Sequence, residues 1–259
     1  MSALSFATWN VNSVRIREPH VCRYLARAQP DVLLLQEIKC EQAQFPAAAF
    51  EAAGYTCVVA GQKSYNGVAV LSRLPMQVRH IALPGLADDD AQARYLEVEV
   101  AGVVIGNLYL PNGNSGGEAG YAYKLAWMDR LADRADTLLA AEKPFVLAGD
   151  YNVCPADIDY AAGTLGSDDA LVRPETRARF RRMVWAGLTD AVRITVPAGP
   201  AYTFWDYQAG AWSRDRGLRI DHAMLSPALA DRLVSAAPDR SLRGEDQPSD
   251  HVPVLVTLE

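Results

Sequence analysis

Residues 144–152 read PFVLAGDYN and contain the pattern on which the fold prediction rests, a short apolar run that ends in polar side chains. A continuous apolar run of this length before a glycine is typical of a strand buried on both faces. Asp150 and Asn152 follow it two positions apart, which in extended backbone places both side chains on one face. We therefore expect a buried sheet whose rim presents polar groups that act together on one phosphate or one metal ion.

The same pattern recurs on both sides of this stretch. Polar residues stand at the ends of apolar runs or within them: Asn10 and Asn12, Glu37, Tyr109, Asp221, and Asp250 with His251. The runs predict further strands at 5–10, 31–36, 68–71, 97–109 with a break at Gly102, 219–225 and 252–258. A single carboxylate after a strand is more often a turn or a helix cap. So many in the same position favour a shared site.

Helices are predicted between these strands. Apolar residues recur at helical spacing in 19–29, 121–141 and 175–185. Mixed strands and helices without a low-complexity linker favour α/β layers, with sheets inside and helices outside. The length and the half-hydrophobic composition can bury a large core and allow one or two domains. Since no linker divides the chain, we expect a single domain over 1–259. This pattern alone does not distinguish two packed sheets from one.

The charge of the chain bears on whether its partner is a nucleic acid. The net charge is −6, whereas contacts with phosphate require Lys and Arg. Carboxylates that bind a cation count as negative in this sum although the bound ion would offset them. The best candidate for a basic face is RPETRARFRR at 173–182, with Arg173, Arg177, Arg179, Arg181 and Arg182. The alternative for this segment is a solvated helix face without a role in DNA binding.

Targeting and membrane signals are missing from the sequence. The first residues, MSALSFATWN, lack the basic stretch and apolar run of a signal peptide, and no apolar run approaches the length of a membrane span. The four cysteines form no CxxC pair, so structural zinc is not expected. We therefore expect a reduced, cytoplasmic protein without membrane contact.

The polar residues themselves predict a class of chemistry. Glu37 directly follows a buried apolar strand, so its ionised carboxylate needs a partner of opposite charge or a hydrogen-bond donor. A hard divalent cation is one such partner. Oxygen ligands favour Mg²⁺, or Mn²⁺, over zinc. Hydrolysis of a phosphodiester needs an oriented water, positive charge near the phosphoryl oxygens and help for the departing 3′ oxygen. The residue set fits a metal-dependent phosphodiesterase.

Eight motifs together resemble one known family. WNVNSVR, DVLLLQEIK, YNGVAVLSR, NLYLPNG, GDYNVCP, YTFWDY, RGLRIDH and PSDHVPV occur here in the order seen in the exonuclease III family of abasic-site endonucleases. The resemblance runs from about residue 4 to the end of the chain. It implies a DNase I-like fold, a four-layer αββα sandwich of two packed mixed sheets.

The resemblance also implies roles for individual residues. Asn12, Glu37 and Asp250 are expected on the metal side of the site, with Asp150, Asn152 and His251 close enough to share the metal. Asp150 would activate water or protonate the leaving group, with Asn10 orienting it. Asn152 and Tyr109 would contact the phosphate, and Asp221 would buttress His251. Three of these residues have structural alternatives: a salt bridge with Arg219 for Asp221, a core tyrosine for Tyr109 and a purely structural role for His251.

A second group of residues is expected to face the DNA. By resemblance, Phe204, Leu218 and Ile220 form an apolar pocket for a sugar that lacks a base, and Trp205 packs beneath it. The alternative is that all of them are core. Asn112 and Asn114 lie in a loop that reaches a DNA groove in the family. Glu245 and Asp246, just before PSDH, would repel DNA unless they point away. His20, His80 and His222 have no comparable context and are treated as ordinary residues.

The implied activity is Mg²⁺-dependent hydrolysis of the phosphodiester 5′ to abasic sites, with 3′–5′ exonuclease and 3′-phosphodiesterase or phosphatase activity. The implied partner is double-stranded DNA with abasic sites or 3′ ends, bound by a monomer. One alternative is another phosphoester substrate, such as an inositol phosphate or a phospholipid. A second alternative is a non-catalytic nucleic-acid-binding regulator on a nuclease-like scaffold.

Overall fold

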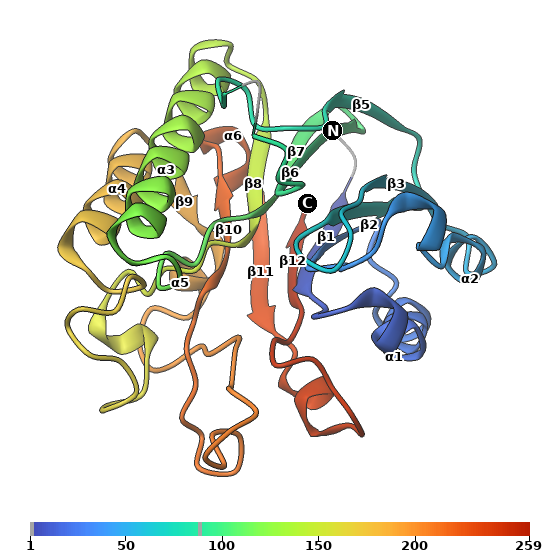
Figure 1. Ribbon diagram of the computed structural model, residues 1–259. Helices are drawn as coiled ribbons and strands as arrows, with labels where there is room; N and C mark the ends of the chain where they lie inside the picture. Colours follow the sequence, from blue (N-terminus) through green and yellow to red (C-terminus); the bar gives the residue numbers. More distant parts are fainter. Residues whose placement is uncertain (1–2, 88–89) are drawn as a thin grey trace.

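Two six-stranded sheets pack face to face, with helices on both outer faces (Figure 1). The computed structural model describes residues 3–87 and 90–259. The first sheet has the order β11-β12-β1-β2-β4-β3, with β11 Leu233–Pro238, β12 Val254–Leu258, β1 Leu4–Asn10, β2 Val32–Gln36, β4 Val68–Ser72 and β3 Thr56–Ala60. The second has the order β5-β6-β7-β8-β10-β9, with β5 Met76–His80, β6 Tyr95–Val100, β7 Val103–Tyr109, β8 Phe145–Asp150, β10 Asp221–Leu225 and β9 Thr189–Asp190.

Both sheets are mixed, because β1–β2 and β7–β8 are parallel pairs among antiparallel ones. The longer helices that cover the outer faces are α1 Val14–Ala28, α3 Gly117–Ala140 and α4 Pro174–Trp185. Shorter helices are α2 Ala47–Glu51, α5 Ala191–Thr195 and α6 Pro227–Ala230, with 3-10 turns at Gln42–Gln44, Asp157–Asp159 and Arg240–Gly244. The predicted four-layer αββα sandwich is confirmed.

The strands alternate faces, and this places the polar ends. In β1, Phe6 faces the core between the sheets while Trp9 packs outward among α1 residues. In β8, Ala148 faces the same inner core while Leu147 packs outward against α3. Asn10 and Asp150 share the parity of Phe6 and Ala148, so they arrive at the edge of the inner layer.

The break predicted at Gly102 is confirmed as the turn of a hairpin that joins β6 and β7. The edge strands β3, β5, β9 and β11 were not predicted, and one predicted helix begins at a different residue. Helix α1 begins at Val14 rather than at Pro19, which lies inside it. Proline inside a helix removes one main-chain hydrogen bond. The helix continues because Val21 and Leu25 are buried in the cluster beneath it.

A buried polar bridge joins the sheets just below the site. Gln36 of β2 donates through Nε2 to Asn107 Oδ1 at 2.7 Å and to Thr8 Oγ1 at 2.9 Å. Asn107 of β7 donates back to the main-chain oxygens of Leu35 at 3.0 Å and Ala69 at 2.8 Å. Directional hydrogen bonds across an otherwise apolar layer set how one sheet lies on the other.

None of the helices within 3–87 and 90–259 combines the length and the apolar character needed to span a bilayer.

We predict that Asn107→Leu destabilises the protein by about 1–3 kcal/mol, because it leaves buried polar atoms without partners. Urea denaturation measures this. The control is Gln77→Leu on β5, where the side chain is exposed and the expected change is within about 0.5 kcal/mol. Equal effects of the two substitutions would contradict a role for the bridge.

Candidate active site

At the rim, the side chain of Asn10 joins the two sheets. Asn10, the last residue of β1, donates through Nδ2 to Glu37 Oε1 at 2.9 Å and to Asp150 Oδ2 at 3.0 Å. Glu37 follows β2 in the first sheet, and Asp150 ends β8 in the second. Asn10 is fully buried, so its amide joins two carboxylates from different sheets away from water. The structure thus brings these three predicted residues together.

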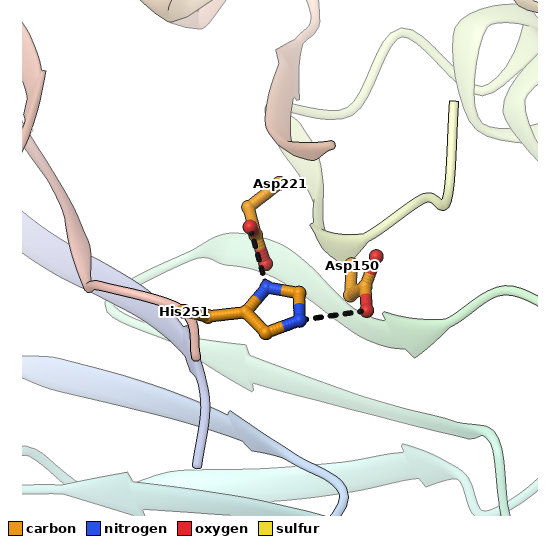
Figure 2. A group of neighbouring side chains, drawn as sticks. All are labelled: Asp150, Asp221 and His251. Carbon is orange, nitrogen blue, oxygen red and sulfur yellow. Dashed lines mark hydrogen bonds and ion pairs between the residues drawn. The ribbon is translucent and has the colours of Figure 1, made fainter. Parts of the chain in front are cut away.

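Two aspartates flank a buried histidine (Figure 2). His251 Nδ1 donates to Asp221 Oδ2 at 2.8 Å, and His251 Nε2 lies 3.7 Å from Asp150 Oδ2. Burial opposes the charged imidazolium, but the carboxylates of Asp221 and Asp150 outweigh it and raise the pKa of His251. The arrangement therefore holds a cation between two acids.

Asp150 differs from an ordinary aspartate. Burial raises its pKa and the negative charge of Asp221 adds to this, whereas His251 and the hydrogen bond from Asn10 act against it. A carboxylate with a raised pKa accepts a proton more readily near neutral pH, as a general base requires.

Glu37 lies among polar groups suited to a cation. Lys39 Nζ lies 2.7 Å from Glu37 Oε2 and donates to Asn12 Oδ1 at 2.6 Å. Asn12 Nδ2 in turn donates to Asp250 Oδ1 at 3.1 Å. Burial acts to raise the pKa of Glu37, but Lys39 and Asn10 outweigh it and lower that pKa, so the carboxylate is ionised. Carboxylate and amide oxygens are the ligands that a hard metal ion takes, and an ion bound here would replace the ammonium of Lys39.

A second group could in principle hold a metal. Ligand atoms of Asp150, Asp221 and His251 lie within 4.8 Å of one another. The Nδ1 atom of His251 already donates a hydrogen bond to Asp221. The raised pKa of His251 favours the protonated ring, which has no free lone pair for a metal. On the other side of Asn10, Glu37, Asn12 and Asp250 offer a separate set of oxygen atoms.

Tyr109 stands at the end of β7, and its hydroxyl stays protonated. Burial raises its pKa, as do the charges of Glu37 and Asp150. The guanidinium of Arg94 stacks 4.7 Å from the ring centre and donates to the Tyr109 carbonyl oxygen at 3.2 Å. Tyr109 is thus a fixed hydrogen-bond donor next to the carboxylates.

The residues two positions after Asn10 and Asp150 are placed by turns rather than by extended strand. Asn12 and Asn152 have φ values of 45° and 49°. The main-chain N–H of each is bound by the side chain two residues before, Asn12 by Asn10 Oδ1 at 3.0 Å and Asn152 by Asp150 Oδ1 at 2.9 Å. The expectation of an extended backbone here was wrong, because both strands end before the second residue. Asparagine tolerates this left-handed conformation better than most residues.

A cavity of about 310 Å³ lies next to the Phe204 ring. Its walls include the apolar side chains of Phe204 and Leu218 and the polar side chains of Asp206, Gln208 and Arg216. The Phe204 ring packs edge-on against His251 with ring centres 4.9 Å apart.

The other residues expected to face the DNA do not line this cavity. Ile220 is buried in the cluster that contains Leu218, and Trp205 is buried in the neighbouring one. Neither residue is among those lining the cavity. Asn112 donates to Asn152 Oδ1 at 2.9 Å, and Asn114 donates to Asp169 Oδ1 at 3.2 Å.

The alternative of a salt bridge between Asp221 and Arg219 is wrong. Arg219 pairs instead with Asp159 at 2.6 Å and Asp190 at 2.7 Å. Sequence reasoning also overlooked His222, whose Nε2 lies 2.9 Å from the Val153 oxygen and supports the loop after β8. The sequence analysis also missed Lys39 as the partner of Glu37. Its position two residues after Glu37 was the signal that could have indicated this contact.

The arginine-rich segment forms α4 and is largely engaged with acids. Its ion pairs are Arg173–Glu118, Arg177–Asp157, Arg179–Asp129 and Arg182 with Asp133 and Asp136. Much of its charge is thus paired with acids of the protein itself. Glu245 pairs with Arg23 of α1, which draws this acid toward the helix.

Residues 7–251 match the model of the endonuclease/exonuclease/phosphatase family. The chain belongs to this family. It is 31% identical to exodeoxyribonuclease III of Haemophilus influenzae, covering 97% of this chain and 98% of that protein. It is also 31% identical to an exodeoxyribonuclease of Bacillus subtilis, covering 98% and 99%. These relatives confirm the resemblance to the exonuclease III family.

Solved structures of this family agree. A 3′–5′ exonuclease of Neisseria meningitidis has a TM-score of 0.93 and 40% identity, with 99% of this chain and 100% of that chain covered. An AP endonuclease of Archaeoglobus fulgidus also has a TM-score of 0.93, with 33% identity and 99% coverage of both chains.

We predict that His251 titrates above its ordinary value of about 6.5 in the metal-free protein. Asp221→Asn should lower the midpoint, because the neutral amide no longer stabilises the imidazolium. Side-chain ¹⁵N NMR follows the ring through the titration, with His80 as an exposed internal reference. An unchanged midpoint in the variant would exclude the Asp221 charge as the cause.

Proposed function

We propose that this protein is a metal-dependent DNA repair nuclease that hydrolyses the phosphodiester 5′ to abasic sites, with 3′–5′ exonuclease and 3′-phosphodiesterase or phosphatase activity. The observation that carries the proposal is the convergence of Asp150, His251 and the Asn10-bound Glu37 beside a cavity lined in part by Phe204 and Leu218. We further propose that the chain acts as one domain and as a monomer on duplex DNA.

The protein's own groups would divide the work as follows. Asp150 takes the proton of the attacking water, since its raised pKa suits proton transfer near neutral pH. The water oxygen bonds to phosphorus as the bond to the 3′ oxygen breaks. His251 places positive charge beside the phosphoryl oxygens, and Tyr109 donates a hydrogen bond to the phosphate or to the leaving oxygen. Asn152, held by its turn, contacts the scissile phosphate.

Asn12, Glu37 and Asp250 would hold Mg²⁺, or Mn²⁺ in its place. When bound, the ion supplies Lewis-acid stabilisation of charge on the phosphate.

The cavity would select the substrate. Phe204 and Leu218 offer an apolar surface next to His251, and a sugar without a base can enter at low cost because it has no stacking to lose.

We predict that Asp150→Asn lowers the rate of incision of an abasic duplex by about 10²–10⁴-fold, because the amide cannot accept the proton. Single-turnover kinetics in magnesium measures this, with circular dichroism to check the fold. The matched control is Asp136→Asn on α3, which pairs with Arg182 at the surface and should keep the wild-type rate. Undiminished incision by Asp150→Asn would reject its role.

We also predict that chelation with EDTA abolishes incision and that added Mg²⁺ or Mn²⁺ restores it. Glu37→Gln should raise the metal concentration needed for half-maximal rate, because a neutral ligand binds a hard cation more weakly. The same assay on an inositol phosphate tests the alternative that the substrate is a phosphoester other than DNA. Cleavage of that ester without incision of DNA would favour the alternative substrate, and DNA binding without any turnover would favour the regulator.

A further inference from the structure

A lysine is buried directly behind the site. Lys124 of α3 is fully buried, although lysine is among the residues least often found inside a protein. Its Nζ donates to the main-chain oxygens of Pro111 at 3.2 Å, Asn112 at 3.1 Å and Asn152 at 2.6 Å. The first two acceptors lie in the loop after β7, and the third lies in the loop after β8.

We propose that Lys124 is a positioning residue, whose ammonium joins these two loops and thereby orients Asn152 and Asn112 toward the substrate. This inference rests on the proposed function. Neither loop has regular structure at these residues, so their relative position depends on side-chain contacts, of which those of Lys124 come from outside both loops.

Asn152 is held at all of its polar groups. Its carbonyl oxygen accepts from Lys124, and its N–H is bound by Asp150 Oδ1. Its side-chain Nδ2 donates to the Leu110 oxygen at 2.9 Å, and its Oδ1 accepts from Asn112 at 2.9 Å. Leu110 and Asn112 lie in the loop after β7. The Asn152 side chain therefore joins the same two loops that Lys124 joins through the Asn152 carbonyl oxygen.

The packing of Gly113 is an independent sign of this arrangement. Gly113 has a φ of +87°, and a Cβ added there would lie 2.6 Å from Lys124 Cδ and 3.1 Å from Ala170 Cβ. The loop main chain therefore rests directly on the lysine side chain. No larger residue fits without displacing one of them.

The charge itself comes at an energetic cost. Burial lowers the pKa of Lys124 to about 7, although Asp150 and Asp169 act to raise it. An apolar side chain of the same length would fill the space without desolvating a cation. What it could not do is donate hydrogen bonds to three carbonyl oxygens at once.

The test compares Lys124→Met with Arg134→Gln, which removes a cation paired with buried Glu97 farther along the same helix. We expect Lys124→Met to lower kcat for abasic incision by about 10²-fold, as displacement of a reactive group by about 1 Å can do. KM should change less than threefold. Arg134→Gln should lower the melting temperature but keep kcat.

A second readout does not depend on activity. In ¹⁵N spectra of the free protein, the side-chain amide signals of Asn112 and Asn152 should shift in Lys124→Met and stay in place in Arg134→Gln. If Lys124→Met does not fold, Gly113→Ala serves as a milder displacement and should give the same shifts with a smaller loss of kcat.

Wild-type kcat in Lys124→Met together with unchanged amide signals would overturn the proposal. So would a fall in kcat no greater than that of Arg134→Gln at equal loss of melting temperature. A wild-type protein that is inert on abasic DNA would instead refute the proposed function, and the amide signals alone would then decide whether Lys124 orients the two asparagines.

Discussion

The amide of Asn10 is the contact on which the rest of the site depends. One nitrogen binds a carboxylate from each sheet, so the spacing of the two sheets becomes the spacing of Glu37 and Asp150. Apolar packing between sheets is not directional and would tolerate sliding. The buried hydrogen bond between Gln36 and Asn107, deeper between the sheets than Asn10, restricts that sliding. The chemistry of the rim therefore depends on polar contacts inside the core as much as on the rim residues.

Charges of opposite sign alternate across the site. Lys39 lies against Glu37, and His251 lies between Asp150 and Asp221. Each buried charge has a partner, which is the condition for keeping it ionised away from water. Glu37 is kept as an anion and His251 as a cation, while Asp150 is left with a raised pKa. Acidic and basic groups can thus coexist within a few ångströms, each suited to a different step of hydrolysis.

The two sheets use the same local device at their rims. Asn10 with Asn12, and Asp150 with Asn152, form matching turns in which the first side chain binds the main chain of the second residue. In each turn the chain leaves the strand direction, and the asparagine two positions later lies beside the residue that ends the strand. The loop after β8 is then supported from behind by His222 and Lys124, which bind the carbonyl oxygens of Val153 and Asn152.

The sequence by itself predicted the inner strands of both sheets, the three longer helices and the polar residues that follow the strands, because apolar periodicity and turn preferences act over a few residues. It missed the edge strands β3, β5, β9 and β11 and the short helices. It left open whether one sheet or two would form, and only the resemblance of the motifs to a family predicted two. Tertiary structure alone decided that Asn10 would meet Asp150, 140 positions away, and that Lys124 would bind two loops. It also decided that the arginines of α4 would pair with acids. Such contacts depend on which strand ends and helix faces meet across the packed layers, and local periodicity carries no information about that.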